Sequence, residues 1–291
     1  MSSYYEFSPS SILPEQPRQV FRLAQKVLVN LHTKEPLPND ISHLIVATTC
    51  PDMLAPSLGQ MINEAFHQTF SKCHTIDMVQ GCAGGVSALI LGSQLAELNK
   101  SKVLVVQADA AKKATSSSSD IYKIFGNGSF ACIIEYQDSK KGLLFTMSRQ
   151  YKGLSELVTV DLGHDADAII KKEIKHIALD PRKYLGLSVQ KLLAIKLLKN
   201  AEKFYLEFIQ KSGNPDVLIL HQVNPLVIQH LKSVFSKYPL EFIDYSEMTG
   251  NCGAASVGVA LDQIKNLIHG KKVLLCSFGT GGVITAGLWQ N

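Results

Sequence analysis

The sequence predicts an α/β fold built from two copies of one strand-and-helix layout. Three pairs of similar stretches occur in the same order in the two halves of the chain. The pairs are HLIVATTCPD (43–52) with DVLILHQVNP (216–225), GCAGGVSALILGSQLAELNK (81–100) with GNCGAASVGVALDQIKNLIHG (250–270), and FGNGSFACIIEY (125–136) with FGTGGVITAGLW (278–289). Ordered self-similarity is typical of a duplicated architecture. We therefore expect an N-terminal half, 1–145, and a C-terminal half, 146–291.

The remaining elements follow from hydrophobic spacing. Apolar runs of strand length alternate with stretches of helical spacing, which predicts sheets covered on both faces. Further strands are predicted at 102–109, 142–148, 157–162 and 271–278, and further helices at about 15–32, 55–70 and 183–211. The helices that open at 82 and 251 are apolar nearly all round, which predicts burial between two sheets. The Ser-rich stretch 114–120 is predicted to be an exposed loop.

Composition excludes several classes of protein. The 291 residues are 46% hydrophobic and 19% charged, enough for a large core. The net charge of +4 comes from dispersed lysines, so nucleic acid is not an expected partner. No apolar run approaches a membrane span and the N-terminus lacks a signal-peptide pattern, so we expect no membrane and a cytoplasmic protein. The six cysteines form no C-x-x-C pair, which argues against a zinc site and a disulfide framework.

Cys82 is the candidate nucleophile. A thiol in the first turn of a buried helix meets unpaired backbone N–H groups and the positive end of the helix dipole, which favour the thiolate. Small neighbours (Gly81, Ala83, Gly84 and Gly85) leave room for a substrate at the sulfur. The backbone N–H of Cys82 would donate to a developing oxyanion, with a second donor expected in the glycine turn 279–282.

His221 and Asn251 are predicted to meet Cys82. In a duplicated fold, corresponding strand ends and helix starts converge on the pseudo-twofold axis. His221 follows a predicted strand, and Asn251 lies at the start of the second apolar helix. A cysteine, an imidazole and an amide suit chemistry in which a thioester forms on sulfur and the next carbonyl is polarised by two neutral donors.

Each candidate also has an ordinary structural interpretation. Cys82 could be a small buried apolar residue, His221 a satisfied strand-end histidine and Asn251 a helix cap. Gly282 could be a packing glycine, with Gly281 as the true oxyanion donor. The order of the repeat and the coincidence of the three residue types favour the catalytic interpretation.

Several motifs resemble those of the thiolase superfamily, most closely its 3-oxoacyl-acyl carrier protein synthase III group. They are ATTCPDMLAPSLGQMI (47–62), VQGCAGGVSALILG (79–92), FGNGSFACII (125–134), HQVNPLVIQHL (221–231), GNCGAASVGVALD (250–262) and SFGTGGVITAG (277–287). The resemblance implies α/β/α/β/α layers with two central mixed sheets. It makes Cys82 the acyl-accepting nucleophile, assigns His221 and Asn251 to the activation of a second thioester, and places Asn224 in the substrate site. The Cys82 amide and Gly282 would form the oxyanion hole.

The resemblance also implies a reaction and partners. Similar enzymes take an acyl group from coenzyme A onto cysteine, then decarboxylate a malonyl thioester of acyl carrier protein whose carbanion attacks the acyl enzyme. It implies acyl-CoA or acyl carrier protein substrates, a homodimer paired through a sheet edge, or a heterodimer with a related subunit. It implies no metal and no redox cofactor.

The chain departs from the family pattern at three places. The strand and loop that precede the first helix in the family are expected to be absent or shortened. Leu226 stands where the family has an arginine, and Asn127 stands where it has an aspartate. These departures favour a specialised fatty-acid, polyketide or secondary-metabolite pathway. The alternatives are acyl transfer to an oxygen or nitrogen acceptor, thioester hydrolysis, or a subunit of a heterodimeric synthase. The acyl tunnel is expected in the loops 53–70, 112–124 and 150–186.

Overall fold

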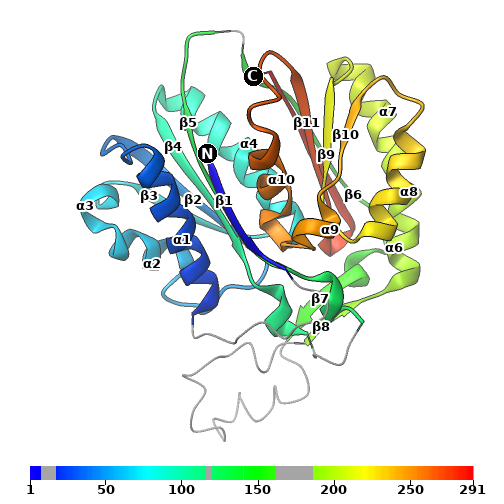
Figure 1. Cartoon of the computed structure of the whole chain (residues 1–291), viewed down its shortest axis with the longest axis horizontal. Helices are drawn as coiled ribbons and strands as arrows, with labels where there is room; N and C mark the ends of the chain where they lie inside the picture. The colour runs from blue at the N-terminus through cyan, green and yellow to red at the C-terminus, as the bar shows by residue number, and fades with distance from the viewer. Residues whose placement is uncertain (8–17, 116–119, 140, 162–185, 291) are drawn as a thin grey trace, which may run out of the picture.

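Two five-stranded sheets face each other across a central pair of helices (Figure 1). The computed structural model describes residues 1–7, 18–115, 120–139, 141–161 and 186–290. The central helices are α4 (Gly84–Asn99) and α10 (Ser256–Ile264). The architecture is the α/β fold with two sheets and buried helices that the sequence predicts.

The first sheet has the order β1-β5-β4-β2-β3. Its strands are β1 (Ser2–Glu6), β2 (Ile41–Thr48), β3 (His74–Val79), β4 (Lys102–Asp109) and β5 (Asn127–Glu135). The strands β4, β2 and β3 run parallel, whereas β5 is antiparallel to both β4 and β1. The sheet is therefore mixed.

The second sheet repeats this order as β6-β12-β11-β9-β10. Its strands are β6 (Gly142–Gln150), β9 (Val217–Leu220), β10 (Glu241–Ile243), β11 (Lys272–Gly279) and β12 (Val283–Gln290). The orientations match as well, because β11, β9 and β10 are parallel and β12 is antiparallel to β11 and β6. The second sheet begins at Gly142, and the domain boundary at 145 stays a prediction.

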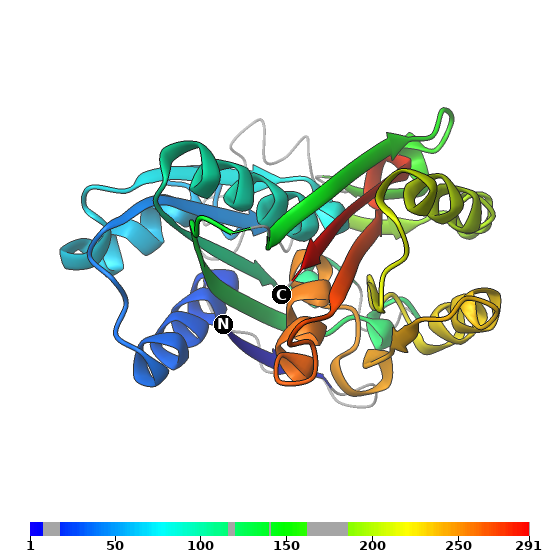
Figure 2. The same cartoon turned by 90° about the horizontal axis from the view of Figure 1, so that it is seen from above.

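The outer helices form one layer on each side (Figure 2). The first sheet is covered by α1 (Gln19–Lys34), α2 (Leu58–Ala65) and α3 (His67–Phe70), and the second by α6 (Lys191–Leu198), α7 (Ala201–Ser212) and α8 (Pro225–Phe235). A short helix, α9 (Ser246–Thr249), follows β10. A two-stranded ribbon of β7 (Val158–Asp161) and β8 (Gly186–Val189) lies beside them.

The three largest apolar clusters of the described residues fill the spaces between the layers. The central cluster joins Val86 and Leu89 of α4 to Val257 of α10 and to strand residues of both sheets, such as Ile45 and Ile219. The other two lie between each sheet and its outer helices. Burial on all sides explains why α4 is apolar nearly all round.

The helix at the centre of the fold corrects one expectation. Residues Gly81–Asn99 are long and apolar enough, by length and composition, to cross a membrane. The expectation that no apolar run approaches this length is therefore wrong. However, 56% of that window is buried inside the protein, between the two sheets. This burial identifies it as a core helix.

Two further expectations about local structure need correction. The segment before the first helix, expected to be absent or shortened, is not absent, because it contains a strand, β1, that pairs with β5 from Ser2 to Glu6; whether the segment is shortened stays a prediction. The predicted helix 183–211 begins with a strand, because Gly186–Val189 pairs with β7, and it is then split into α6 and α7. Residues 8–17, 162–185 and most of the predicted loop 114–120 lie outside the described residues.

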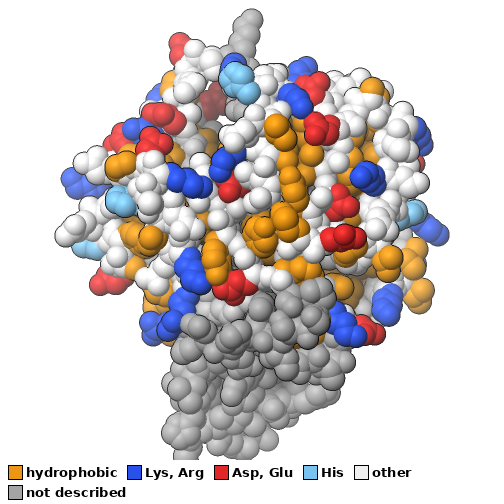
Figure 3. All heavy atoms as spheres, viewed as in Figure 1, with side chains coloured by type: hydrophobic (Ala, Val, Ile, Leu, Met, Phe, Trp, Pro, Cys, Tyr) orange, Lys and Arg blue, Asp and Glu red, His pale blue; other side chains and the backbone are white. Residues whose placement is uncertain are grey.

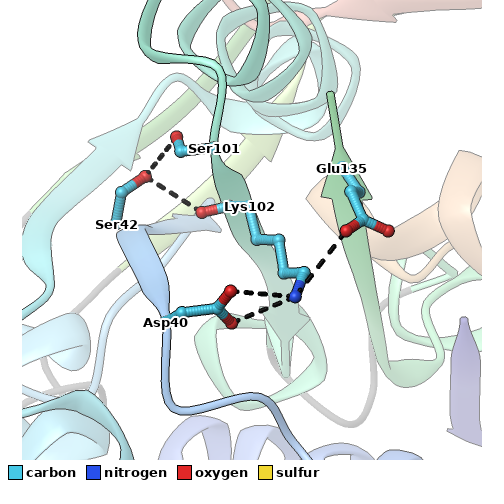
Figure 4. Close-up of polar contacts among 5 residues, drawn as sticks. All are labelled: Asp40, Ser42, Ser101, Lys102 and Glu135. Atoms are coloured by element: carbon cyan, nitrogen blue, oxygen red, sulfur yellow. Dashed lines mark hydrogen bonds and ion pairs between the residues drawn. The ribbon is translucent and has the colours of Figure 1, made fainter. Parts of the chain in front are cut away.

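A polar cluster ties together the strands of the first sheet at the end where β2 and β4 begin (Figure 4). The Lys102 ammonium lies 2.9 Å from Asp40 Oδ2 and 3.6 Å from Glu135 Oε1. Ser42 Oγ lies 2.7 Å from Ser101 Oγ and donates to the backbone carbonyl of Lys102 at 2.9 Å. Since β2 and β4 are parallel, their carboxyl ends meet at the opposite edge, where α/β proteins place their ligands.

Acidic and basic side chains are interspersed over the described part of the face in Figure 3. Among the described residues, surface ion pairs join Lys26 to Glu6 and Lys271 to Glu241.

Candidate active site

Cys82 lies in a 3-10 turn, η1 (Gly81–Ala83), that leads directly into α4. Gly81 has φ +58°, and a Cβ there would lie 2.2 Å from Thr280 Oγ1, so this turn requires glycine. Ser277 Oγ, on β11 of the second sheet, donates to the backbone carbonyl of Cys82 at 2.7 Å. The candidate nucleophile is therefore held by β11, which of the three parallel strands of the second sheet comes last in the sequence.

The two central helices touch where they begin. A Cβ on Gly85 would lie 1.9 Å from the carbonyl oxygen of Ala254, so the two backbones are in direct contact. Ala254 belongs to the 3-10 turn η6 (Gly253–Ala255), which leads into α10. Gly85 follows Cys82 by three residues, and Ala254 follows Asn251 by three. The segments that carry these two side chains thus converge, as the duplicated fold predicts.

The electrostatics at Cys82 differ from the expectation. Burial raises the pKa of the Cys82 thiol to about 11, and the nearby Asp109 carboxylate adds to the rise. The hydroxyl and backbone amide of Thr280 act in the opposite direction. The loss of hydration raises the thiol pKa more than the backbone N–H groups and dipole of the helix start lower it. Cys82 is therefore a neutral thiol at rest, and the expected thiolate is not favoured.

His221 follows β9 directly and is buried. Its backbone N–H donates to Cys276 O at 2.9 Å, and its ring meets Phe278 edge to face with centroids 6.0 Å apart. Neither Nδ1 nor Nε2 has a hydrogen-bond partner among the described residues. Burial lowers the pKa of His221 to about 4, so the ring is neutral. Buried polar atoms without partners are costly and mark a group available to a ligand.

Asn251 is fixed on both sides by backbone hydrogen bonds. Its N–H donates to Ile124 O at 2.8 Å, and its carbonyl accepts from Gly126 N at 3.0 Å. The side-chain Oδ1 accepts from Gly253 N at 2.9 Å and lies 3.4 Å from Ser256 Oγ. Because Oδ1 is engaged with the helix start, the Nδ2 amide is the group that can donate to a substrate.

The position of Asn251 corrects the alignment of the two halves. Gly81 and Gly253 have φ of +58° and +55°, and each opens a 3-10 turn that leads into a central helix. The structural counterpart of Cys82 is therefore Ala254. Asn251 lies before the turn, so the expectation that it starts the second helix is wrong by two residues.

The glycine turn after β11 lies against the sulfur through Gly279. A Cβ on Gly279 would lie 3.2 Å from both Cβ and Sγ of Cys82. Gly282, at the end of the turn η7 (Thr280–Gly282), packs against Leu154, and its carbonyl accepts from Tyr151 N at 3.0 Å. The role of Gly282 and of the Cys82 amide in an oxyanion hole stays a prediction.

Asn224 is the N-cap of α8, where its Oδ1 accepts from Val227 N at 2.9 Å. Its predicted contact with substrate is not tested by this arrangement. The neighbouring Gln222 joins two segments, because its Nε2 donates to Leu220 O and its Oε1 accepts from Tyr245 N. These bonds hold the segment between His221 and Asn224 against the segment that follows β10.

Two residues near Cys82, Asp109 and Ser277, do not appear among the sequence candidates, whereas Gly279 and Thr280 lie within the predicted glycine turn 279–282. Asp109 is the last residue of β4 and Gly279 the last of β11. Both strands are predicted from the sequence, and ligands gather at the carboxyl ends of such strands. Inspection of each strand end for polar residues would have found Asp109.

The remaining cysteines have structural surroundings. Cys252 is buried, its Sγ lies 3.4 Å from Thr249 O, and burial raises its pKa. Burial likewise raises the pKa values of Cys132 and Cys276 to about 12. Within the described ranges, no group of three or more His, Cys, Asp or Glu side chains is arranged to hold a metal ion.

The duplicated sheets and the cysteine at the start of a buried helix define a transferase of the thiolase fold. The family model "3-Oxoacyl-[acyl-carrier-protein (ACP)] synthase III" matches residues 76–151, and its C-terminal counterpart matches residues 210–291. The chain therefore belongs to the 3-oxoacyl-[acyl-carrier-protein] synthase III family.

Known proteins agree with this assignment. The chain is 25% identical over 284 residues to a beta-ketoacyl-[acyl-carrier-protein] synthase III of Clostridium kluyveri, covering 95% of this chain and 85% of that protein. The fold matches the beta-ketoacyl-[acyl carrier protein] synthase III of Thermus thermophilus with a TM-score of 0.78 at 22% identity, covering 96% of this chain and 86% of the other. It also matches the priming beta-ketosynthase of the R1128 polyketide pathway with a TM-score of 0.77 at 16% identity, covering 96% and 83%.

Proposed function

We propose that the protein is a condensing acyltransferase that forms an acyl thioester on Cys82 and extends it by decarboxylative Claisen condensation. One observation carries the proposal. His221 is a buried, neutral imidazole with no partner among the described residues, and the strand beside it, β11, also holds the Cys82 turn. A group kept neutral and unpaired in this place suits the binding of a thioester carbonyl.

In the first half-reaction, the Cys82 sulfur attacks the carbonyl carbon of an acyl thioester. The carbon–sulfur bond of the donor breaks, and the proton lost by Cys82 leaves with the released thiol. The small residues around the sulfur admit the donor, and the Cys82 amide is the first donor to the oxyanion. The acyl donor is proposed to be acyl-CoA or acyl carrier protein.

In the second half-reaction, His221 and Asn251 donate to the thioester carbonyl of a malonyl-type extender. Carbon dioxide leaves, and the electron pair of the broken bond is delocalised onto that carbonyl. The resulting carbanion attacks the acyl carbon on Cys82, and the sulfur leaves as thiolate and takes a proton. No metal or redox cofactor takes part in these steps. A neutral imidazole suits this role, and its pKa of about 4 keeps it neutral at physiological pH.

The homodimer is proposed to form through β3, the edge strand of the first sheet. β3 pairs with β2 on one side only, and Val79 at its end is 62% exposed. An exposed edge strand presents unpaired backbone groups to a second chain. A second copy paired there would continue the sheet, whereas pairing with a related subunit would give the heterodimeric alternative.

The pathway is proposed to be a specialised branch of fatty-acid, polyketide or secondary metabolism. Leu226, at the position of the family arginine, is 79% exposed at the start of α8. An apolar side chain there would not attract an acidic carrier protein. Thioesters of acyl carrier protein and of coenzyme A must therefore both be tested as acyl donors. We also propose that the protein is cytoplasmic.

The experiment is intact-mass spectrometry of the protein with a panel of acyl-CoA and acyl carrier protein donors. We expect a mass increase equal to the acyl group, absent in Cys82→Ala and present in the matched variant Cys132→Ala. Release of labelled carbon dioxide from a malonyl thioester then separates condensation from simple acyl transfer or hydrolysis. An unmodified wild-type protein across the whole panel would contradict the proposal.

A further inference from the structure

Asp109 is a fully buried carboxylate at the end of β4, 0% exposed. Its Oδ2 accepts from the backbone N–H of Thr49 at 3.0 Å and from that of Ala254 at 2.8 Å. Thr48 Oγ1 lies 3.5 Å from Oδ1. One carboxylate therefore joins the end of β2, in the first half, to the start of the second central helix, in the other half.

The same carboxylate shapes the turn η6, which follows Asn251. A Cβ on Gly253 would lie 2.2 Å from Asp109 Oδ2, and Gly253 has φ +55°, so this position requires glycine. The backbone N–H of Gly253 donates to Asn251 Oδ1 at 2.9 Å. Contacts thus run from Asp109 through Gly253 and Ala254 to the side chain of Asn251.

This arrangement mirrors the one at Cys82. Ser277 on β11 of the second half holds the Cys82 turn, and Asp109 on β4 of the first half holds the turn η6 after Asn251. Each turn is therefore positioned by the last parallel strand of the opposite half. The difference is that the side chain that supports the turn η6 is an ionisable group.

Burying a carboxylate at this position costs free energy, because the charge loses its hydration. Burial raises the pKa of Asp109 to about 6, against the hydrogen bonds from Thr49 and Ala254. Its charge also raises the pKa values of the facing thiols, Cys82 and Cys252. None of the salt bridges among the described residues includes Asp109. Since an apolar or amide side chain would be cheaper to bury, stability alone does not account for a carboxylate here.

We infer that Asp109 is a positioning residue for the condensation half-reaction, which fixes the turn 250–254 so that the Asn251 amide points at the extender thioester. This inference rests on the proposed function. Asp109 touches neither substrate in this role. It follows that its loss should impair condensation and should leave acylation of Cys82 nearly intact.

The test compares wild type with Asp109→Asn in the two half-reactions. Acylation is followed by intact mass, and condensation by carbon dioxide release after the enzyme has been acylated. We expect condensation to fall by at least about tenfold, since small displacements of a catalytic group have large effects on rate. Acylation should change by less than about threefold, and alkylation of Cys82 should reach its thiolate plateau at lower pH because a negative charge has gone.

The matched control is Asp52→Asn. Asp52 is also buried, at 3% exposure, and its carboxylate accepts from the backbone N–H groups of Val20 and Phe21 at the start of α1. It should keep both half-reactions near wild type. If Asp109→Asn does not fold, Asp109→Glu provides the second variant, because it keeps the charge, moves the carboxylate by one methylene and should show the same selective loss.

The outcomes separate the two proposals. Equal losses in both half-reactions would show that Asp109 is merely structural, and no loss in either would show that it positions nothing. Either result overturns the inference while wild type remains a condensing enzyme. If acylated wild type releases no carbon dioxide from any malonyl thioester, the proposed function fails and the inference fails with it.

Discussion

Gly85 and Ala254 face each other so closely that a methyl group on Gly85 would lie 1.9 Å from the Ala254 carbonyl oxygen. This contact brings together the first turns of the two central helices and, with them, Cys82 and Asn251. It is a backbone-to-backbone approach that only glycine permits. The geometry of the candidate site therefore depends on the absence of a side chain.

Gly85→Ala should separate the two helix starts. We expect the free energy of unfolding to fall by about 2–4 kcal/mol, since overpacking against a rigid backbone cannot be relieved by a side-chain rotation. Chemical denaturation measures this. The control is Gly84→Ala, whose Cβ would lie 3.5 Å from Gln80 Cβ in ordinary contact. It should change stability by less than about 1 kcal/mol. Equal behaviour of the two variants would contradict the close approach.

The neutral His221 should make stability sensitive to acid. Its pKa is about 4 in the folded protein and 6.5 when unperturbed, so between these values the unfolded chain binds a proton that the folded chain does not. The contribution of His221 to stability should therefore be constant well above pH 6.5 and fall as the pH drops through 6.5 toward 4. Between pH 7 and 5 the loss due to this residue is about 2 kcal/mol.

Urea unfolding of wild type and His221→Gln at pH 7 and pH 5 measures this contribution. The glutamine variant should lose about 2 kcal/mol less than wild type over the same interval, because it has no proton to bind. The other histidines contribute equally to both proteins. An identical acid dependence of the two proteins would show that His221 is not held neutral by burial.

Thr280 should control the reactivity of the Cys82 thiol. Its hydroxyl and amide favour the thiolate, and burial opposes them. Thr280→Ala should therefore raise the pKa of Cys82 further and slow its alkylation by iodoacetamide at pH 9 by about threefold or more, because a hydrogen bond to the anion is lost. Thr280→Ser retains the hydroxyl and should react like wild type. Alkylation of Thr280→Ala at the wild-type rate would exclude this role.

The edge strand β3 should mediate the proposed dimer. Val79→Lys places a charge at the end of this strand, where Val79 is 62% exposed, and should give a monomer because charged residues oppose edge pairing. Size-exclusion chromatography with light scattering measures the mass. Leu267→Lys, at a residue that is 60% exposed and far along the sequence from β3, should remain a dimer. A monomeric wild type would refute the proposed pairing.

Much of the fold was predictable because its signals are local. The strand 102–109 coincides with β4, and the apolar run after Gly81 is the buried helix α4. In contrast, β10 was not predicted, since a short, partly exposed strand carries a weak periodic signal.

The sequence by itself determined the duplicated α/β layout, the place of Cys82 before an apolar helix and the place of His221 after a strand. These properties follow from the spacing of apolar residues and glycines along neighbouring positions. Only the tertiary structure decided that the Cys82 thiol is neutral, that Asn251 precedes its helix, and that Asp109 reaches the second half. Those properties depend on burial and on contacts between residues such as Asp109 and Ala254, 145 positions apart, which no local pattern encodes.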